Sequence, residues 1–398
     1  MLSFLRYRIR PIVITTVCLA MAGACSDQET PTGPDVRSDS LVPAGMPAYV
    51  VDYFQDQTAG VDNIVRAVWT ACAADGKIGM DGTPYEPGVN CRLINVNEYL
   101  RRFVVYIPEN LAYGPDLPAP VVVMHHGSSG TGEQFLNISG WKEEADEEGF
   151  IAVFPTGAVY YVLDRGRLNT KWNDFSLVDD VDLSIQPPGY PATSPWPADD
   201  VLFENRILDD LADLIAIDTA RTFAAGFSNG GGFTSRLAVE LSDRIAAVGV
   251  MAGGLSQEYV PVERIPGIWA VGTRDDGILE KVNAGLVALG RDTLTSLPID
   301  ADSVMDLPLL PDVLESITLT FDLEPAVYTP VTDSTTFTRF RWSTPQAGNT
   351  DGNVVIFGVM AGVTHQFPRG QRGSRNGNNP LDFDAADLFW SFFERHTQ

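Results

Sequence analysis

A serine between glycines, a later aspartate and a still later histidine could together perform nucleophilic catalysis. The segment GFSNG at residues 226–230 follows a predicted strand and precedes a predicted helix. A tight strand-to-helix turn exposes the hydroxyl of Ser228, and its small flanking residues relieve the crowding. The pattern therefore predicts Ser228 as the nucleophile of an acyl transfer; the alternative is a glycine-rich helix start with an idle serine.

A hydroxyl is a poor nucleophile until a neighbouring base removes its proton. The chain contains 4 histidines, and their positions separate them. His396 lies near the C-terminus, and His125 and His126 precede the nucleophile in the chain. His365 follows the predicted strand VVIFGVM and precedes the last predicted helix. A Ser, Asp, His order along the chain places the base there, so we expect His365 to be the general base.

The acid of such an arrangement should follow a strand that lies between the nucleophile and the base. The predicted strand at 268–271 is followed by Asp275 and Asp276. We favour Asp275 as the carboxylate that holds the imidazole Nδ1–H. The alternative is an aspartate that only caps a helix.

The segment HHGSSG at residues 125–130 follows the buried run PVVVM. A glycine-rich turn there lets a backbone N–H point at a developing oxyanion. We expect the N–H groups of Ser128 and Asn229 to form this oxyanion hole, and His126 to hold the loop. The alternative is a plain strand-to-helix turn.

The elements that would carry these residues alternate between strands and helices. Residues 99–107 alternate as in an antiparallel strand, whereas the continuous run at 120–124 suits a strand buried on both faces. Residues 201–216 have helical spacing with an aspartate cap. Further strands are expected at 150–154, 222–225, 245–251, 268–271 and 354–359, and helices at 231–241 and 385–394. This alternation predicts an α/β fold, with a mostly parallel central sheet and helices on both faces.

Residues 282–345 interrupt the alternation. They contain a short helical pattern at 282–289, a stretch rich in leucine and proline, and an expected strand pair around 317–323 and 335–342. Because both ends of this insertion return to the rim of the predicted site, we expect a partial lid that lines the substrate pocket. A peripheral addition packed away from the site is the alternative.

Residues 1–24 are typical of an export signal, with arginines followed by an uncharged, mostly apolar run. The run ends in AGAC, which resembles the lipobox of bacterial lipoproteins, where the cysteine is acylated. We therefore expect lipidation of Cys25; an ordinary signal peptide is the alternative. The lipid would be the sole membrane contact. Residues 25–45 are expected to form a flexible tether and residues 46–398 the catalytic domain, in the bacterial envelope (outer membrane or periplasm) or outside the cell.

Composition excludes several classes of partner. The chain has 52 acidic and 27 basic residues, a formal charge of -25, so a nucleic acid is not expected as a partner. No stretch beyond the N-terminus is long and apolar enough to span a membrane. No Cys/His cluster or phosphate-cradling loop is present, so neither a metal nor an organic cofactor is expected.

Two cysteines remain after the signal and the acylated residue are set aside. In an exported protein, Cys72 and Cys91 are expected to form a disulfide, worth roughly 3 kcal/mol in the chain-entropy model. The alternative is a pair of buried thiols.

Taken in order, these motifs resemble those of the poly(3-hydroxybutyrate) depolymerase and feruloyl esterase group of α/β hydrolases. The matching segments are HHGSSG, GFIAVFPTG, WND, DDV, GFSNGGG, GTRDD and GVTHQFPRG. The resemblance extends over about residues 99–396, without much of 282–345. It implies the α/β-hydrolase fold, a triad of Ser228, Asp275 and His365, and no cofactor.

Departures from the family pattern bear on the substrate. Phe367 stands where the family usually has tryptophan, and Ser128 where many relatives have cysteine. Phe227 and Gln366 occupy positions that tannases and fungal feruloyl esterases can bridge by a disulfide, which disfavours that subgroup. Trp172 matches a family position near the substrate cleft, where it would either stack on an aromatic or sugar group or pack under the loop.

The resemblance and the residues together predict a serine carboxylic-ester hydrolase that acts through an acyl-enzyme. Its substrate is expected to be a small or oligomeric ester, bound in part by Trp172 and Phe367. Two alternatives remain open: a serine peptidase on the same fold, and a non-catalytic, lipid-anchored carbohydrate-binding protein with a hydrolase fold.

Overall fold

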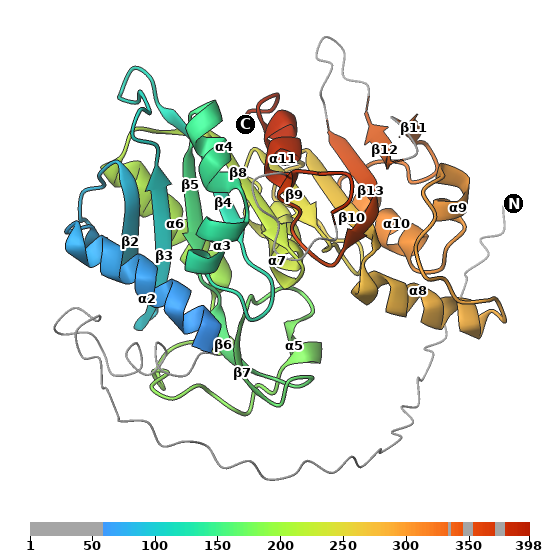
Figure 1. Ribbon diagram of the computed structural model, residues 1–398, viewed down its shortest axis with the longest axis horizontal. Helices are drawn as coiled ribbons and strands as arrows, with labels where there is room; N and C mark the ends of the chain where they lie inside the picture. Colours follow the sequence, from blue (N-terminus) through green and yellow to red (C-terminus); the bar gives the residue numbers. More distant parts are fainter. Residues whose placement is uncertain (1–58, 333–335, 345–352, 371–378) are drawn as a thin grey trace, which may run out of the picture. The chain divides into compact units, whose positions relative to one another are not determined.

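The computed structural model describes residues 59–332, 336–344, 353–370 and 379–398, which contain a sheet of eleven strands (Figure 1). The strand order from edge to edge is β1-β2-β3-β5-β4-β8-β9-β10-β13-β12-β11. The strands are β1 Ile78–Gly79, β2 Gly88–Val96, β3 Tyr99–Ile107, β4 Ala119–His125, β5 Ile151–Pro155, β8 Ile217–Phe227, β9 Ala247–Met251, β10 Gly267–Arg274, β11 Thr329–Thr332, β12 Phe337–Ser343 and β13 Val354–Thr364. A separate hairpin joins β6 (Ala158–Val162) to β7 (Arg167–Lys171).

The centre of the sheet is parallel, from β5 through β4, β8, β9 and β10 to β13. β3 pairs antiparallel with β2 and β5, as the alternation in its sequence predicted. β12 and β11 add antiparallel strands beyond β13. A parallel sheet whose chain order reverses at β4 and β5 and that begins with antiparallel strands is the α/β-hydrolase fold, so the predicted fold class is confirmed.

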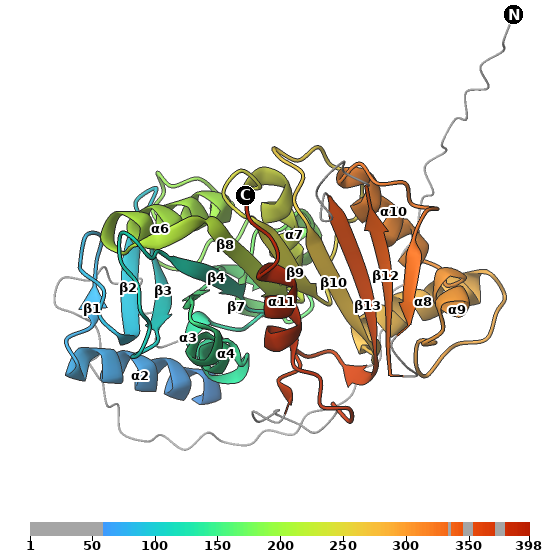
Figure 2. The same cartoon turned by 90° about the horizontal axis from the view of Figure 1, so that it is seen from above.

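Helices cover both faces of the sheet (Figures 1 and 2). On one face lie α6 (Asp200–Leu214), α7 (Asn229–Glu240), α8 (Asp276–Ala288) and α10 (Leu310–Thr320); on the other lie α3 (Gly132–Ile138), α4 (Trp141–Glu148) and α11 (Ala385–Phe393). The remaining helices are α2 (Ala59–Ala74), α5 (Leu177–Asp180) and α9 (Ala301–Met305). Buried apolar side chains form one large cluster on each face, so the central strands are shielded from solvent on both faces.

The parallel strands bring the predicted functional turns to one edge of the sheet. β4 ends at His125, β8 at Phe227, β10 at Arg274 and β13 at Thr364. Because these strands are parallel, their carboxyl ends lie at the same edge, and each is followed by one of the four turns singled out in the sequence.

The insertion at 282–345 is part of the cover of the sheet. Leu286, Leu297, Val304 and Leu314 are buried in the same apolar cluster as the strands. Its last segment supplies β11 and β12, which extend the sheet. The insertion therefore has a structural role in the core, whatever its relation to the substrate.

One expected strand in this insertion is wrong. Residues 317–320 belong to helix α10, which buries Leu314 and Ile317 on one side. The hydroxyls of Thr318 and Thr320 donate to the carbonyls four residues earlier, each at 2.7 Å. β-branched residues favour strands in general, but here helical burial decides. The second strand of the expected pair is present as β12. It pairs with β11 and β13, and not with residues 317–323.

The expected disulfide between Cys72 and Cys91 is present, with a Cα–Cα distance of 6.0 Å. It fastens α2 to β2, and both cysteines lie in a small buried cluster with Trp69 and Leu93. This cluster is separate from the two large ones, so the covalent bond supplements a modest apolar contact.

The expectations for the export signal, the acylated Cys25 and the tether lie outside the described residues. Within the described part of the chain, no helix combines the length and the apolar character needed to cross a bilayer.

Replacing both bridging cysteines, Cys72→Ala with Cys91→Ala, should lower the free energy of unfolding by roughly 3 kcal/mol, because the open loop regains entropy in the unfolded chain. Guanidinium titrations with and without a reductant measure the effect. The reductant should lower the midpoint of the wild type and leave that of the double variant unchanged. Equal midpoints for both proteins in oxidising buffer would contradict the assigned role of the bond.

Candidate active site

Ser228 occupies a sharp turn between β8 and α7, as the sequence predicted. Its backbone angles are φ 54 and ψ −123, a conformation that is costly for any residue except glycine. Side chains are excluded at the neighbouring glycines. A Cβ on Gly226 would lie 2.2 Å from the carbonyl oxygen of Gly230, and one on Gly230 would lie 2.3 Å from that of His126. The glycines therefore permit the strained turn.

The structure brings Ser228, His365 and Asp275 into one hydrogen-bonded chain. The distance from His365 Nε2 to Ser228 Oγ is 2.9 Å, and that from His365 Nδ1 to Asp275 Oδ2 is 2.8 Å. A carboxylate can only accept, so Nδ1–H donates to Asp275 and Nε2 is left to accept the Ser228 proton. This is the geometry that a hydroxyl nucleophile and its base require.

Asp275 has two roles that the sequence presented as alternatives. Its Oδ1 accepts the N–H of Ile278 at 3.1 Å and caps α8, while its Oδ2 holds the imidazole. The side chain is completely buried. Asp276, by contrast, is exposed at the first position of the helix. The structure thus selects Asp275 as the hydrogen-bond partner of His365.

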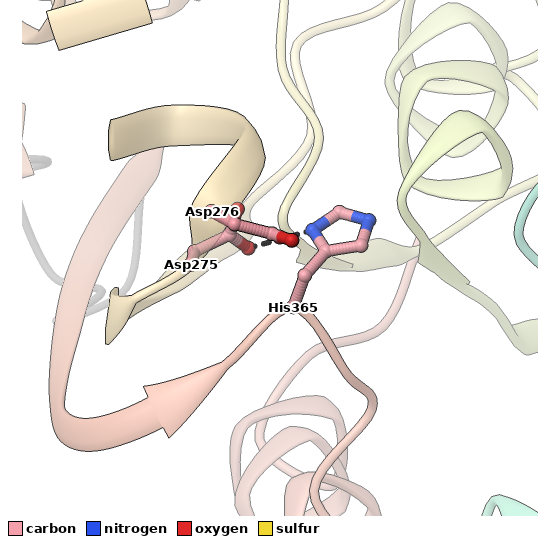
Figure 3. Close-up of side chains that lie close together, drawn as sticks. All are labelled: Asp275, Asp276 and His365. Atoms are coloured by element: carbon pink, nitrogen blue, oxygen red, sulfur yellow. Dashed lines mark hydrogen bonds and ion pairs between the residues drawn. The ribbon is translucent and has the colours of Figure 1, made fainter. Parts of the chain in front are cut away.

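Charge around His365 favours its protonated form. Burial by itself lowers the pKa of His365, but the hydrogen bond and charge of Asp275, with the charge of Asp276, outweigh it and raise the pKa above the usual value. Figure 3 shows both carboxylates beside the ring. Within the described residues these three side chains also meet the spacing of a metal site. Both ring nitrogens of His365 are already engaged, however, by Asp275 and Ser228.

The glycine-rich turn after β4 lies against the serine. A Cβ on Gly127 would be 3.3 Å from the Cβ of Ser228. The turn is fixed from below by Thr170, whose carbonyl accepts the N–H of Ser129 at 2.8 Å and whose hydroxyl donates to the carbonyl of Gly130 at 2.6 Å. None of the hydrogen bonds among the described residues uses the N–H of Ser128, so it is available to a ligand.

The N–H of Asn229, the second expected oxyanion donor, opens helix α7 and so has no partner within the helix. Its side chain was not singled out in the sequence. Asn229 Oδ1 accepts the N–H of Trp172 at 2.8 Å, and its Nδ2 donates to Asp174 at 2.9 Å. Burial raises the pKa of Asp174, while the Asn229 hydrogen bond opposes that rise. These contacts fasten the start of the helix to the loop after β7.

The expected substrate contact of Trp172 is wrong. Its side chain is completely buried, stacked at 5.0 Å between ring centroids on Phe233. Its indole N–H donates to the carbonyl of His126 at 2.9 Å. Its sequence neighbours are polar, but the ring packs beneath the site. Of the two alternatives, packing under the loop is the one observed.

His126 has the structural role expected of it. Its Nδ1–H donates to the carbonyl of Gly127 at 2.7 Å, and its Nε2 accepts the N–H of Gly157 at 2.9 Å. Burial lowers the pKa of His126 to about 3, so the ring is neutral. His125 is also buried, between Thr234 and Glu204. His396 is buried too, against Phe392.

A cavity of about 260 Å³ opens beside His365. Its polar lining comes from the glycine-rich turn and from polar side chains of α3 and of the His365 loop, and its apolar lining from three phenylalanines and an isoleucine. The lining residues are Gly127, Ser128, Ser129, Gly130, Gln134, Phe135, Ile138, Phe227, His365, Gln366, Phe367 and Arg369. Phe367, which was expected to contact the substrate, is one of the lining residues. The described residues of the 282–345 insertion contribute nothing to this cavity, so a lid over it is not observed.

Comparison with known proteins gives relatives among esterases. No protein-family model matches the chain. It is similar to feruloyl esterase B of Piromyces equi, with 27% identity over 192 residues, 47% of this chain and 31% of that protein. It is also similar to the bifunctional acetylxylan esterase/xylanase XynS20E of Neocallimastix patriciarum, with 27% identity over 223 residues, 54% of this chain and 28% of that protein.

Feruloyl esterase D of Neurospora crassa is 25% identical over 166 residues, 40% of this chain and 47% of that protein. The chain thus spans between 28% and 47% of the length of these three curated relatives. Among solved structures, an acetyl xylan esterase from Aspergillus awamori has a TM-score of 0.44 at 13% identity, covering 74% of this chain and 94% of that one.

The strain at Ser228 predicts a stability difference between two variants of this residue. Ser228→Gly should be more stable than Ser228→Ala by about 1 kcal/mol, because only glycine adopts a positive φ without steric cost. Thermal denaturation measures this. Ser176 is the matched control, since its φ of −106 is ordinary and glycine there should not exceed alanine in stability. Equal melting temperatures for the two Ser228 variants would show that the turn is not strained.

Proposed function

We propose that this protein is a serine carboxylic-ester hydrolase with Ser228 as nucleophile, His365 as general base and Asp275 as the residue that orients it. The observation that carries the proposal is His365 lying 2.9 Å from the Ser228 hydroxyl and 2.8 Å from the Asp275 carboxylate. The similarity to feruloyl and acetylxylan esterases supports ester hydrolysis as the reaction.

In the proposed reaction, Ser228 Oγ attacks the carbonyl carbon of the ester while His365 Nε2 takes the hydroxyl proton. A tetrahedral oxyanion forms, and the C–O bond to the alcohol then breaks as His365 returns the proton to the leaving oxygen. Water attacks the acyl-enzyme with His365 again as base, which releases the acid and restores the serine. Asp275 keeps the ring in the required tautomer and stabilises its positive charge.

The oxyanion is proposed to form against the backbone N–H groups of Ser128 and Asn229. Both lie next to Ser228, one in the turn packed on its Cβ and one at the start of α7. Two preorganised donors in this position stabilise charge that develops only in the transition state. The scheme needs no metal or organic cofactor.

Part of the substrate is proposed to enter the cavity beside His365. Its phenylalanine rings, Phe135, Phe227 and Phe367, suit an apolar or aromatic group of the ester. The similarity to feruloyl and acetylxylan esterases favours small or oligomeric esters of the feruloyl or acetylated-polysaccharide type as substrates. Hydroxybutyrate oligomers remain the alternative suggested by the motifs. The rival functions, a serine peptidase or a non-catalytic carbohydrate-binding protein, are distinguished by the experiment below.

Export from the cytoplasm is part of the proposal. The disulfide between Cys72 and Cys91 is of a kind that persists in oxidising compartments. Together with the signal-like N-terminus it supports a location in the cell envelope or outside the cell, with Cys25 as the acylated residue.

Ser228→Ala should abolish hydrolysis of p-nitrophenyl acetate and methyl ferulate and lose labelling by a fluorophosphonate probe, a fall of about 10⁴ to 10⁶ in kcat. Asp275→Asn should lower kcat by roughly 10³ to 10⁴ with little change in KM, because the wrong imidazole tautomer is held. Stopped-time assays on the folded variants measure both. More than a tenth of wild-type activity in Ser228→Ala would overturn the assignment, and activity on peptides but not esters would favour the peptidase.

Cys25→Ala should leave uncleaved precursor and abolish incorporation of labelled palmitate in a bacterial host, because the acylated thiol directs processing of a lipoprotein. Normal maturation of this variant would indicate an ordinary secretory signal instead.

A further inference from the structure

A second carboxylate stands at the site without a part in the proposed reaction. Asp276 follows Asp275 at the first position of α8 and is exposed. The charged atoms of Asp275 and Asp276 and a ring nitrogen of His365 all lie within 4.8 Å of one another (Figure 3). Within the described part of the chain, Asp276 accepts one hydrogen bond, from the adjacent N–H of Gly277 to its Oδ1 at 3.1 Å.

Among the described residues, three charged side chains shift the pKa of His365, and the effect of each one can be measured. The cap and first turns of α8 carry these charges: Asp275 and Asp276 raise the pKa of His365, and Lys281 lowers it. On its own loop Arg369 is paired with Glu143. The strand-to-helix turn between β8 and α7 contributes the hydroxyl of Ser228, and the turn at 127–130 contains no ionisable residue. The preceding Arg274 is exposed at the end of β10.

We propose that Asp276 is a positioning residue that stabilises the imidazolium form of His365 during each proton transfer, acting through space from outside the hydrogen-bonded chain. The inference rests on the proposed hydrolase function. Its physical basis is Coulombic: a carboxylate a few ångströms from a ring that becomes positive lowers the energy of that state. Because Asp276 is exposed, water and salt weaken the interaction, whereas the buried Asp275 is screened much less.

The sign of the effect follows from the charge. His365 must be neutral to act as base, so the rise of kcat/KM with pH reports its ionisation in the free enzyme. Asp276→Asn removes a negative charge and should move this rise to lower pH by about 0.5 unit at low ionic strength, and by much less in 1 M NaCl. The pH-independent plateau should fall about two- to fivefold, since the imidazolium is less stabilised.

Three variants of α8 serve as matched controls. Lys281→Gln removes the opposing charge and should move the rise to higher pH. Glu280→Gln removes another exposed negative charge of the same helix, one that is not among the charges shifting the pKa of His365, and should leave the profile unchanged. Asp276→Glu keeps the charge and should restore most of the wild-type behaviour.

Nuclear magnetic resonance titration of the His365 ring gives a readout independent of turnover. The pKa of His365 should fall in Asp276→Asn and rise in Lys281→Gln. An unchanged pKa in Asp276→Asn, or an equal shift in Glu280→Gln, would overturn the inference. Failure of the proposed hydrolase function would be seen separately, because Ser228→Ala would then retain activity. The titration would still test the effect of Asp276 on the pKa of His365 in that case.

Discussion

One imidazole can reach a hydroxyl on one side and a carboxylate on the other only because β8, β10 and β13 end at the same edge of the sheet. β10 and β13 approach so closely that a Cβ on Gly272 would lie 2.1 Å from the carbonyl oxygen of Val363. The register of the two strands shifts at this point, just before Asp275 and His365. The distances within the proposed triad are therefore set by backbone pairing, and the side chains only complete them.

The strained turn at Ser228 is held in place by hydrogen bonds among neighbouring residues that are not part of the proposed triad. The side chain of Asn229 joins the start of α7 to the backbone of Trp172, and Trp172 in turn donates to the carbonyl of His126 beneath the glycine-rich turn. The two turns that would bind an oxyanion are thus linked through one buried tryptophan. In the proposed reaction, such a link would hold both N–H groups in place before the substrate binds, as preorganised donors require.

Sequence patterns predicted the parts of the structure that depend on local geometry. The spacing of glycines predicted the turn at Ser228, and the alternation of strands and helices predicted the loops that carry Asp275 and His365. Both patterns depend on residues that are close in the chain. Predictions from sequence patterns were wrong where packing between residues far apart in the chain determines the structure. Trp172 lies among polar neighbours yet is buried by Phe233, which is far from it in sequence. Helix α10 consists partly of β-branched residues that tertiary burial holds in a helix.

The central claim is that Ser228 becomes covalently acylated, and mass spectrometry of a trapped intermediate tests it most directly. The enzyme is mixed with a slowly deacylating p-nitrophenyl ester, quenched in acid during the initial burst of nitrophenol, digested and mapped. One equivalent of acyl group is expected on the peptide that contains Ser228. A burst with the acyl group on another residue, or turnover with no acylated peptide at any time, would contradict it.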